Sequence, residues 1–378
     1  MKPTRARPLT IVADDLTGAC DTGALFAARA PVPVSIWPRR AAADAVVRVV
    51  DTESRTLSGP DAAERAATVA AGGRARHWFK KIDSTLRGPI GAEVDALMRA
   101  TGIATAIVCP AFPAQRRVVL DRALLVAGTP VAATPIARDP TFPAGAGSSV
   151  VDLLRPQLDR ALAWIPIDQL RAGADALAAR LRRLAGTAIV ADGETDADLE
   201  ALVEAALTVT PEPLLVGSAG LGRALAARLG LLGERVELPA GARWLVVAGS
   251  AHPATRRQVK EARAAGLTVL ATPERAAADR AEVVARLVEQ AVAAIERERW
   301  DLVVVTGGET AVALWSALGA DRMEVAGAPA PGLALGHLRL AGREPQAVLT
   351  KAGGFGPPDL FVSLQMAVRS GSPVEGRR

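Results

Sequence analysis

Residues 77–98, HWFKKIDSTLRGPIGAEVDALM, contain the unit from which the fold of this chain can be derived. An apolar run, HWFKKI, ends in a polar loop, and Pro89 then suits the first turn of a helix. Apolar residues recur at helical spacing at Ile90, Val94 and Leu97. A buried strand followed by such a helix is the building block of a parallel sheet.

The same alternation continues along the sequence. Val-, Ile- and Leu-rich runs alternate with helical stretches, the runs being LTIVA, AVVRVVDT, TAIVCPAF, TAIVADG and PLLVGS, then WLVVAGS, LTVLAT, LVVVTGG and AVLTKAGG. Strand alternating with helix predicts a parallel sheet with helices on both faces. We therefore predict an α/β protein with two domains, each a mostly parallel sheet flanked by helices.

The length of 378 residues favours two hydrophobic cores over one. The stretch LGLLGERVELPAGAR, residues 229–243, separates two strand–helix series and is the expected linker. The predicted domains are residues 1–230 and 241–378. A Pro- and Gly-rich segment, residues 112–149, is expected to be irregular or hairpin-like and is a candidate cover for a site.

Composition excludes several classes of function. The formal net charge is +5, but arginines alternate with acids in stretches such as RAEVVARLVEQAVAAIERER, as on a solvated surface. No nucleic-acid-binding motif is present, so a nucleic-acid partner is not expected. Two cysteines and three histidines form neither a disulfide framework nor a metal-ligand pattern. The apolar run near the N-terminus is too short for a signal peptide or membrane span, so we expect a cytoplasmic protein without a membrane partner.

Two aspartates, Asp14 and Asp15, follow the first expected strand in ADDLTGA. Ligands of open parallel sheets bind beyond the carboxyl ends of the strands, so both acids are candidates for a general base or a metal-associated carboxylate. Adjacent side chains on a strand point in opposite directions, so we expect the two to have different functions. The alternative is that they cap the following helix, and spacing alone leaves both interpretations open.

The loop after HWFKKI concentrates polar side chains, although only five of the 45 basic residues of the chain are lysines. These side chains belong to Lys80, Lys81, Asp83, Ser84, Thr85 and Arg87. Cations suit a carboxylate, and carboxylates and hydroxyls suit sugar hydroxyls, so the loop favours a small hydroxylated anion. Only one lysine needs to face the ligand, and Lys81 is nearer to Asp83. Arg55 in VVDTESR is a further candidate cation, and capping plus surface ion pairs is the alternative.

Glycines follow three expected strands in the second half, in VVAGSAHPAT, VVVTGGETAVALW and LTKAGGFGPPDL. Glycine lets the backbone approach a ligand closely and leaves N–H groups free to face phosphate oxygens. Three such turns, the last with the isolated Lys351, predict a nucleotide site. The phosphate-loop motif and the dinucleotide fingerprint are absent, which disfavours a standard phosphate-loop ATPase and a hydride-transfer enzyme.

The motifs ADDLTGA, DTESR, KKIDSTLRG, CPAFP, VTGGETA and KAGGFG occur in this order over nearly the whole chain. Together they resemble the four-carbon acid sugar kinase family. The resemblance implies an ATP-dependent enzyme with a sugar-acid-binding N-terminal domain and a nucleotide-binding C-terminal domain. Its reaction would phosphorylate a terminal hydroxyl of threonate, erythronate or an oxo-tetronate, with the active site in the cleft between the domains. The alternative is a non-catalytic sensor of sugar acid or nucleotide, and a homo-oligomer is left open.

Carried over motif by motif, the resemblance implies a sugar-acid pocket made of Asp14, Arg55, Lys81, Asp83, Ser84 and Arg87. The implied ATP pocket consists of Ser250, Gly307, Gly308, Lys351, Gly353, Gly354 and Gly356. We expect Asp15, or alternatively Asp14, to accept the hydroxyl proton, and Mg²⁺ to bridge the phosphates with no protein ligand assigned. The sequence departs from the family pattern at Arg116, where a glycine is usual, and at Ala352, where a serine is common.

Overall fold

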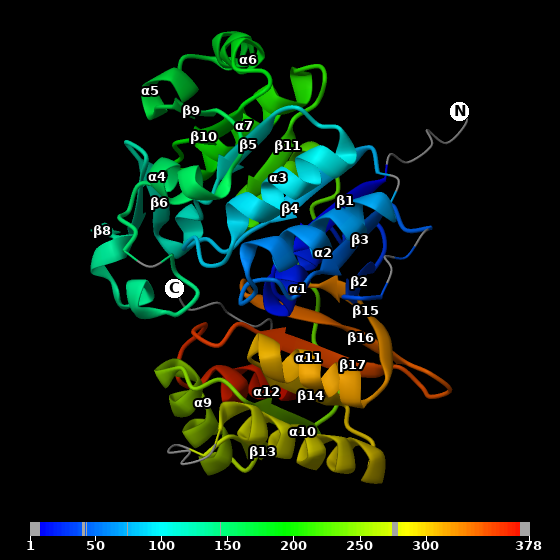
Figure 1. Cartoon of the computed structure of the whole chain (residues 1–378). Helices are drawn as coiled ribbons and strands as arrows, with labels where there is room; N and C mark the ends of the chain where they lie inside the picture. Colours follow the sequence, from blue (N-terminus) through cyan, green and yellow to red (C-terminus); the bar gives the residue numbers. More distant parts are fainter. Residues whose placement is uncertain are drawn as a thin grey trace. The chain divides into compact units, whose positions relative to one another are not determined.

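The computed structural model describes residues 8–39, 42, 44–73, 75–143, 145–273 and 279–370 (Figure 1). The chain divides into two compact units. Unit 1 comprises Met1–Thr22 and Arg40–Leu232, and unit 2 comprises Gly23–Arg39 and Gly233–Arg378. Each unit is a sheet combined with helices, so the predicted α/β class is confirmed.

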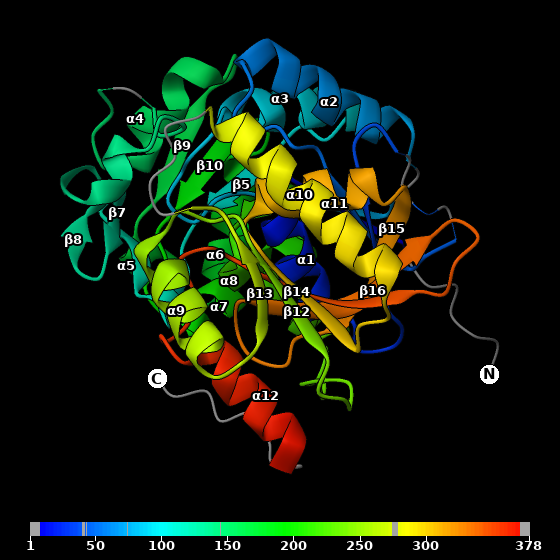
Figure 2. The same cartoon turned by 90° about the horizontal axis from the view of Figure 1, so that it is seen from below.

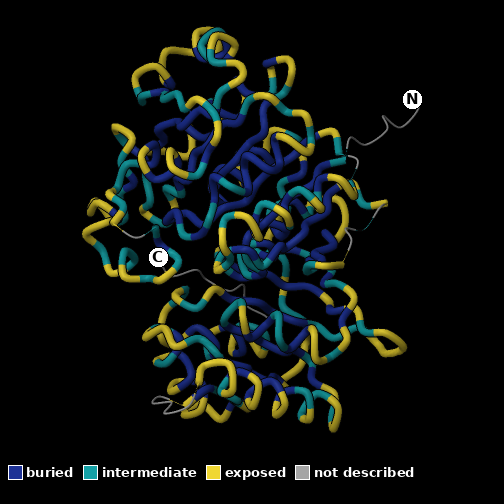
Figure 3. The backbone as a smooth tube through the Cα atoms, in the orientation of Figure 1, coloured by how far each residue is buried: buried dark blue, intermediate teal, exposed yellow. Residues whose placement is uncertain are grey.

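The sheet of unit 1 has the strand order β3-β1-β4-β11-β5-β10-β9, and all its neighbouring strands are parallel. Its strands are β1 (Leu9–Ala13), β3 (Val47–Asp51), β4 (His77–Lys81), β5 (Ala106–Cys109), β9 (Leu162–Ile165), β10 (Ala188–Ala191) and β11 (Leu214–Gly217). Except for β9, these strands are buried along their whole length. In Figure 3 the dark blue, buried chain lies in the interior, and the exposed chain lies mostly at the periphery. Complete burial is typical of a parallel sheet covered on both faces, which confirms the predicted sheet.

The helices of unit 1 follow the expected alternation with strands. They are α1 (Leu16–Leu25), which continues into unit 2, then α2 (Gly59–Ala71), α3 (Ile90–Thr101), α4 (Val150–Leu154), α5 (Ile167–Leu170), α6 (Ala174–Arg183), α7 (Asp196–Thr208) and α8 (Ala219–Arg228). The predicted apolar face of α3 is buried at Ile90, Val94, Leu97 and Met98. Gly102 ends this helix in the left-handed conformation that glycine adopts without steric cost.

The Pro- and Gly-rich segment of residues 112–149 is hairpin-like, as predicted. It forms a small antiparallel sheet of β6 (Arg117–Leu120), β7 (Ala123–Val126) and β8 (Thr129–Pro130). Its 3₁₀ turns are η1 (Pro113–Gln115), η2 (Val131–Ala133) and η3 (Pro135–Arg138). A further turn, η4 (Arg155–Gln157), follows α4 outside this segment. The amide of Gly88 donates to the carbonyl of Thr141 at 2.7 Å. The segment therefore lies against the polar loop after β4.

The sheet of unit 2 has the order β13-β12-β14-β17-β16-β15-β2. The strands from β13 to β17 in this order are parallel, and the remaining pairs are antiparallel. The strands are β2 (Val32–Ile36), β12 (Trp244–Ala248), β13 (Thr268–Ala271), β14 (Leu302–Thr306), β15 (Ala320–Gly327), β16 (Leu333–Leu340) and β17 (Gln346–Lys351). The sequence did not predict the long strands β15 and β16, because β15 alternates buried and partly exposed residues and so presents no apolar run.

The helices of unit 2 pack in two pairs. They are α9 (Pro253–Ala264), α10 (Arg280–Arg297), α11 (Gly308–Ala317) and α12 (Leu360–Ser370). In Figure 2, α9 lies beside α12 and α10 lies beside α11. Val259 of α9 and Phe361 of α12 belong to one hydrophobic core with the strand residues Trp244, Val246 and Leu302. Alternate strand residues point to the opposite face, which leaves that face for α10 and α11.

One boundary differs from the sequence prediction, which placed residues 1–230 in a single domain. Gly23–Arg39 cluster with unit 2, because β2 pairs antiparallel with β15, with Val34 opposite Met323 and Val32 opposite Val325. A pairing between segments so far apart leaves no local signal in the sequence. The expected linker, residues 229–243, contains neither a helix nor a named strand.

Candidate functional site

The polar residues singled out in the first domain follow three neighbouring strands. β1 lies between β3 and β4, with Ala13 level with Asp51 on one side and with Lys81 on the other. The segments after these strands therefore meet at the edge of the sheet where ligands of parallel sheets bind. This edge carries a set that we call the Arg55 cluster: Asp14, Asp15, Arg55, Lys81, Asp83, Ser84, Arg87 and Arg117.

Arg55 is at the centre of this cluster. Its Nε donates to Asp14 Oδ2 at 2.7 Å and its Nη2 to Asp15 Oδ1 at 2.6 Å, while Nη1 lies 3.8 Å from Asp83 Oδ2. Burial by itself would lower the pKa of Arg55, but Asp14, Asp15 and Asp83 raise it well above its usual value. One guanidinium thus holds together acids from the loops after β1 and β4.

Asp83 and Arg87 form the second ion pair of the cluster. Asp83 Oδ1 accepts from the amide and hydroxyl of Thr85, and Asp83 Oδ2 accepts from Arg87 Nη2 at 2.6 Å. Arg87 Nη1 also donates to Asp139 Oδ2 at 3.1 Å. Burial raises the pKa of Asp83, but Arg87 and Arg55 outweigh that effect and hold the pKa well below its usual value. Asp83 is therefore an ionised, fixed carboxylate.

Asp14 and Asp15 have different environments. Asp15 Oδ1 accepts from the Gly18 amide at 3.1 Å and Oδ2 from the Thr17 hydroxyl at 2.5 Å, so Asp15 also caps α1, as the alternative interpretation proposed. Burial raises the pKa of Asp15, but Arg55 and Lys81 bring it below its usual value. The side chain of Asp14 is 1% exposed and that of Asp15 is 17% exposed. Asp14 Oδ1 has no hydrogen-bond partner among the described residues.

The two adjacent lysines point to opposite sides of β4. Lys80 is fully buried, and its ammonium donates to Glu93 Oε1 at 2.7 Å, an oxygen that also accepts from the Ser54 hydroxyl at 2.6 Å. Lys81 faces Asp15, whose pKa it lowers. Within the described ranges the ammonium of Lys81 has no ion pair within 4.0 Å. The structure therefore places Lys81, the lysine chosen from the sequence, in the Arg55 cluster.

Arg117, at the start of β6, belongs to the cluster but was not predicted. Its Nη1 donates to the hydroxyl of Ser84, and no carboxylate of the described residues forms an ion pair with it. Burial lowers the pKa of Arg117, and Asp83 opposes this effect. The sequence feature that could have identified Arg117 is the stretch after CPAFP. In that stretch Arg117 directly follows Arg116, the residue that departs from the family pattern.

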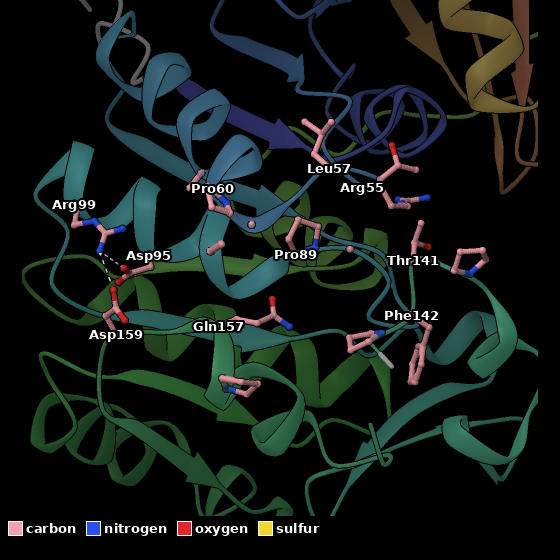
Figure 4. A pocket seen from close by; sticks show the side chains of 18 residues that line it. Arg55, Leu57, Pro60, Pro89, Asp95, Arg99, Thr141, Phe142, Gln157 and Asp159 are labelled. Atoms are coloured by element: carbon pink, nitrogen blue, oxygen red, sulfur yellow. Dashed lines mark ion pairs between the residues drawn. The ribbon is translucent and has the colours of Figure 1, made fainter. Parts of the chain in front are cut away.

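A cavity of about 630 Å³ adjoins the cluster between α2, α3 and residues 140–143 (Figure 4). It meets the cluster at Arg55, and neither Asp14, Asp15 nor Asp83 lines it. At its other end, Arg99 pairs with both Asp95 and Asp159. The chemistry predicted from the sequence is thus located beside this cavity and not in it.

In unit 2 the glycine turns after β12, β14 and β17 converge. β14 lies between β12 and β17, so their carboxyl ends are adjacent. A Cβ atom added to Gly353 would lie 2.3 Å from Ser250 Oγ, and one added to Gly307 would lie 3.3 Å from the Ser250 amide. Gly308 is the first residue of α11, and Gly356 has a φ of 85°. Ser250 and the predicted glycines therefore lie in closely packed backbone at one edge of this sheet.

Lys351 lies underneath this edge. Its side chain is fully buried, and its ammonium donates to the carbonyls of Ala352 at 2.8 Å and of Gly353 and Phe355 at 3.0 Å. Burial lowers the pKa of Lys351 to about 7. The nearby His252 also has a lowered pKa, because of burial and the charges of Lys351 and Arg257.

The described residues contain no group of three or more His, Cys, Asp and Glu side chains that could hold a metal ion. A protein cage for Mg²⁺ therefore does not fit this part of the chain. In the same residues, no helix combines the length and apolar character needed to cross a bilayer.

Comparison with known proteins also divides the chain into two parts, but the first match includes residues 23–39, which cluster with unit 2 in the structure. Residues 9–225 match the family model described as sugar-binding N-terminal domain, and residues 272–361 match the one described as nucleotide-binding C-terminal domain. A D-threonate kinase of Salmonella typhimurium is 32% identical, over 92% of this chain and 95% of the relative. The chain belongs to the four-carbon acid sugar kinase family. It is thereby a member of a family of carbohydrate kinases, as the sequence predicted.

This kinase chain resembles a further member over more than nine-tenths of its length. A 3-oxo-tetronate kinase of Methylobacterium radiotolerans is 31% identical, over 93% of this chain and 97% of the relative. A solved structure from Salmonella typhimurium has the same fold, with a TM-score of 0.79 at 21% identity, over 94% of this chain and 98% of the other. The Arg55 cluster lies within the sugar-binding match, and Lys351 within the nucleotide-binding match.

Proposed function

We propose that this chain is an ATP-dependent kinase that phosphorylates a terminal hydroxyl of threonate, erythronate or an oxo-tetronate. Family membership supports the reaction class. The observation that carries the substrate class is the unused bonding capacity of the Arg55 cluster. After the internal ion pairs are formed, the described residues leave Lys81 and Arg117 without a carboxylate and Asp14 Oδ1 without a donor. Two cations and one acceptor complement a small hydroxy acid.

In this proposal Lys81 and Arg117 bind the carboxylate of the sugar acid. Arg117 has a planar guanidinium that can donate two parallel hydrogen bonds to a carboxylate, and Lys81 has a compact ammonium charge. The Ser84 hydroxyl accepts from Arg117 Nη1 and can contact a substrate oxygen. Arg55 and Arg87 were expected to bind the carboxylate as well, but both are already paired with acids. Their proposed role is to hold Asp14, Asp15 and Asp83 in fixed positions toward the substrate hydroxyls.

Asp15 is the proposed acceptor of the hydroxyl proton, because it is more exposed than Asp14. Its lowered pKa makes it a weak base at neutral pH. Phosphoryl transfer tolerates a weak base, because its loose transition state depends mainly on position and charge neutralisation. Asp14 Oδ1 is the proposed acceptor for a second substrate hydroxyl, which fixes the acid in the pocket.

The nucleotide is proposed to bind at the glycine turns of unit 2, with its phosphates at the N-terminus of α11 and on the loop after β17. Mg²⁺, when bound, supplies charge neutralisation on the phosphate oxygens and is expected to enter with the nucleotide. Ser250, Gly307 and Gly353 are the proposed neighbours of the phosphates, since both glycines lie close to Ser250, Gly307 to its amide and Gly353 to its hydroxyl.

The test is ADP release by the purified full chain with ATP and Mg²⁺, across stereoisomers of threonate, erythronate and 2-oxo- and 3-oxo-tetronate. We expect ADP in a one-to-one ratio with a phosphorylated acid for at least one compound, and none when Mg²⁺ is omitted. Nucleotide and acid that both raise the melting temperature without any ADP formation would instead identify a sensor.

A further inference from the structure

The loop after β17, residues 352–357, directs its carbonyl groups toward three buried or partly buried side chains. Lys351 donates to the carbonyls of residues 352, 353 and 355. Thr255 of α9 donates to the carbonyl of residue 353 at 2.6 Å. Gln258, also of α9 and fully buried, donates to the carbonyls of residues 355, 356 and 357 at 2.8–3.1 Å. The loop is therefore anchored through the carbonyls of residues 352, 353, 355, 356 and 357.

The direction of the carbonyls determines the direction of the N–H groups. In a trans peptide the N–H of one residue points opposite to the carbonyl of the residue before it. The described part of this loop has no cis peptide. The amides of Gly353, Gly354 and Gly356 therefore point away from Lys351 and from α9. The amide of Phe355 donates to the carbonyl of Ala352 at 3.1 Å, and Pro357 has no N–H group.

These three glycine amides have no hydrogen-bond acceptor among the residues that the structure describes. A concave row of such N–H groups is an anion-binding nest. Gly353 and Gly354 lie against the loop after β12, because a Cβ atom at Gly353 would meet Ser250 Oγ at 2.3 Å and one at Gly354 would meet His252 Nε2 at 3.1 Å. The site thus combines three backbone N–H donors that have no acceptor in the described residues with the polar side chains of Ser250 and His252 close by.

Lys351 has no donor left for a ligand. An ammonium has three N–H donors, and three carbonyls accept them here. Lys351 therefore differs from a lysine whose ammonium contacts the phosphate directly.

We propose that Lys351 and Gln258 are positioning residues that create a phosphate-binding nest at Gly353, Gly354 and Gly356 by binding the loop carbonyls from behind. The inference rests on the proposed function only in taking a nucleotide as the source of the phosphate. Its own content is that both side chains act on phosphate affinity without touching the phosphate.

The test measures the binding of three probes to the full chain by calorimetry: ATP, adenosine and inorganic tripolyphosphate. Lys351→Met and Gln258→Leu remove the donors with little change in side-chain volume. We expect each variant to weaken ATP and tripolyphosphate at least tenfold and to leave adenosine binding within twofold of the native value. Lys260→Met, at an exposed lysine of α9, is the matched control and should change none of the three.

Three outcomes would overturn the proposal. If only Lys351→Met weakens tripolyphosphate, the lysine contacts the phosphate directly. If adenosine binding falls as much as ATP binding, the variants disrupt the unit and not the nest. If neither variant affects tripolyphosphate, the nest does not bind phosphate. Tripolyphosphate binding does not depend on any sugar acid, so this result stands apart from a failure to find kinase activity.

Discussion

At the scale of single residues, Asp14 and Asp15 show how two neighbouring carboxylates acquire different properties. Both bind Arg55, but Asp14 is enclosed and keeps one oxygen without a partner, whereas Asp15 caps α1 and reaches the surface of the cluster. The two residues lie between β1 and α1, and only Asp15 is placed to accept from the first amides of α1, so the two carboxylates have different neighbours. Accessibility, and not basicity, favours Asp15 as the proton acceptor.

Asp15→Asn should lower turnover with the best sugar acid about 100-fold, the usual contribution of a general base. ATP binding should stay unchanged, because Asp15 lies in unit 1 and the predicted nucleotide residues lie in unit 2. Steady-state kinetics and calorimetry measure the two quantities, with Asp175→Asn at an exposed position of α6 as the control. Full turnover in Asp15→Asn would assign the proton to another group.

Arg116 occupies a backbone conformation that favours glycine, with φ 55° and ψ 38°. Its side chain is exposed, so Arg116→Gly removes left-handed strain without losing packing. We expect the free energy of unfolding to rise by up to about 1 kcal/mol, since the added freedom of glycine in the unfolded chain offsets part of the gain.

Urea titration followed by circular dichroism measures this change. The same substitution at the exposed Arg286, inside α10, should act in the opposite direction and cost about 1 kcal/mol, because glycine weakens a helix interior. A loss of stability at both positions would show that Arg116 makes a contact that outweighs its strained backbone.

At the scale of elements, a buried ion pair joins β4 to α3 and to the loop after β3. Lys80 and Ser54 both donate to Glu93 Oε1, and the second oxygen of Glu93 has no partner among the described residues. Burial raises the pKa of Glu93, and Lys80 opposes this rise. The next residue after Ser54 is Arg55, so this pair supports the position of the central guanidinium.

Lys80→Met and Glu93→Met should each lower the free energy of unfolding by about 3 kcal/mol or more, because each leaves a buried charge without its partner. The double variant should cost less than the sum by more than about 1 kcal/mol, since it removes both charges. Urea titration of the full chain gives the four values of the cycle.

The exposed pair Glu282 and Arg286 of α10 is the matched control, with side chains 62% and 74% exposed. The same cycle there should give a coupling of no more than about 0.5 kcal/mol, as for other surface pairs. Additive costs at Lys80 and Glu93 would show that the two charges do not interact.

At the scale of the whole molecule, neither unit is one continuous stretch of the sequence. Gly23–Arg39 lie early in the sequence but belong to unit 2, where β2 covers the edge of β15. Without β2, β15 would expose a row of unpaired backbone groups, a common starting point for aggregation. The early segment is therefore part of the folding unit that contains the predicted nucleotide site.

Val34→Asp tests this assignment, because Val34 is fully buried and pairs with Met323. Hydrogen exchange should become faster in β15 and β16, with smaller changes in β9 and β10 of unit 1. Val46→Asp, at a position that is 41% exposed, is the control and should alter neither set. Faster exchange confined to β9 and β10 would contradict the assignment of β2 to unit 2.

The sequence by itself determined the α/β class, the helix after Pro89, the hairpin-like segment and the order of the family motifs. These features depend on local periodicity, on turn residues and on short motifs, all of which can be read within one stretch of chain. The alternation of side chains along a strand predicted that only one of Lys80 and Lys81 needs to face the ligand, and the nearness of Lys81 to Asp83 selected it.

Only the tertiary structure decided where distant segments meet. It paired β2 with β15, brought Arg117 onto Ser84, and turned Lys351 toward the carbonyls of its own loop. Each of these contacts depends on how deeply the residue is buried and on the backbone beside it. Both properties differ between residues of the same type at different positions in the fold. The sequence identified the residues that bear the chemistry, and packing then assigned one lysine to a salt bridge, one to the acid cluster and one to a loop.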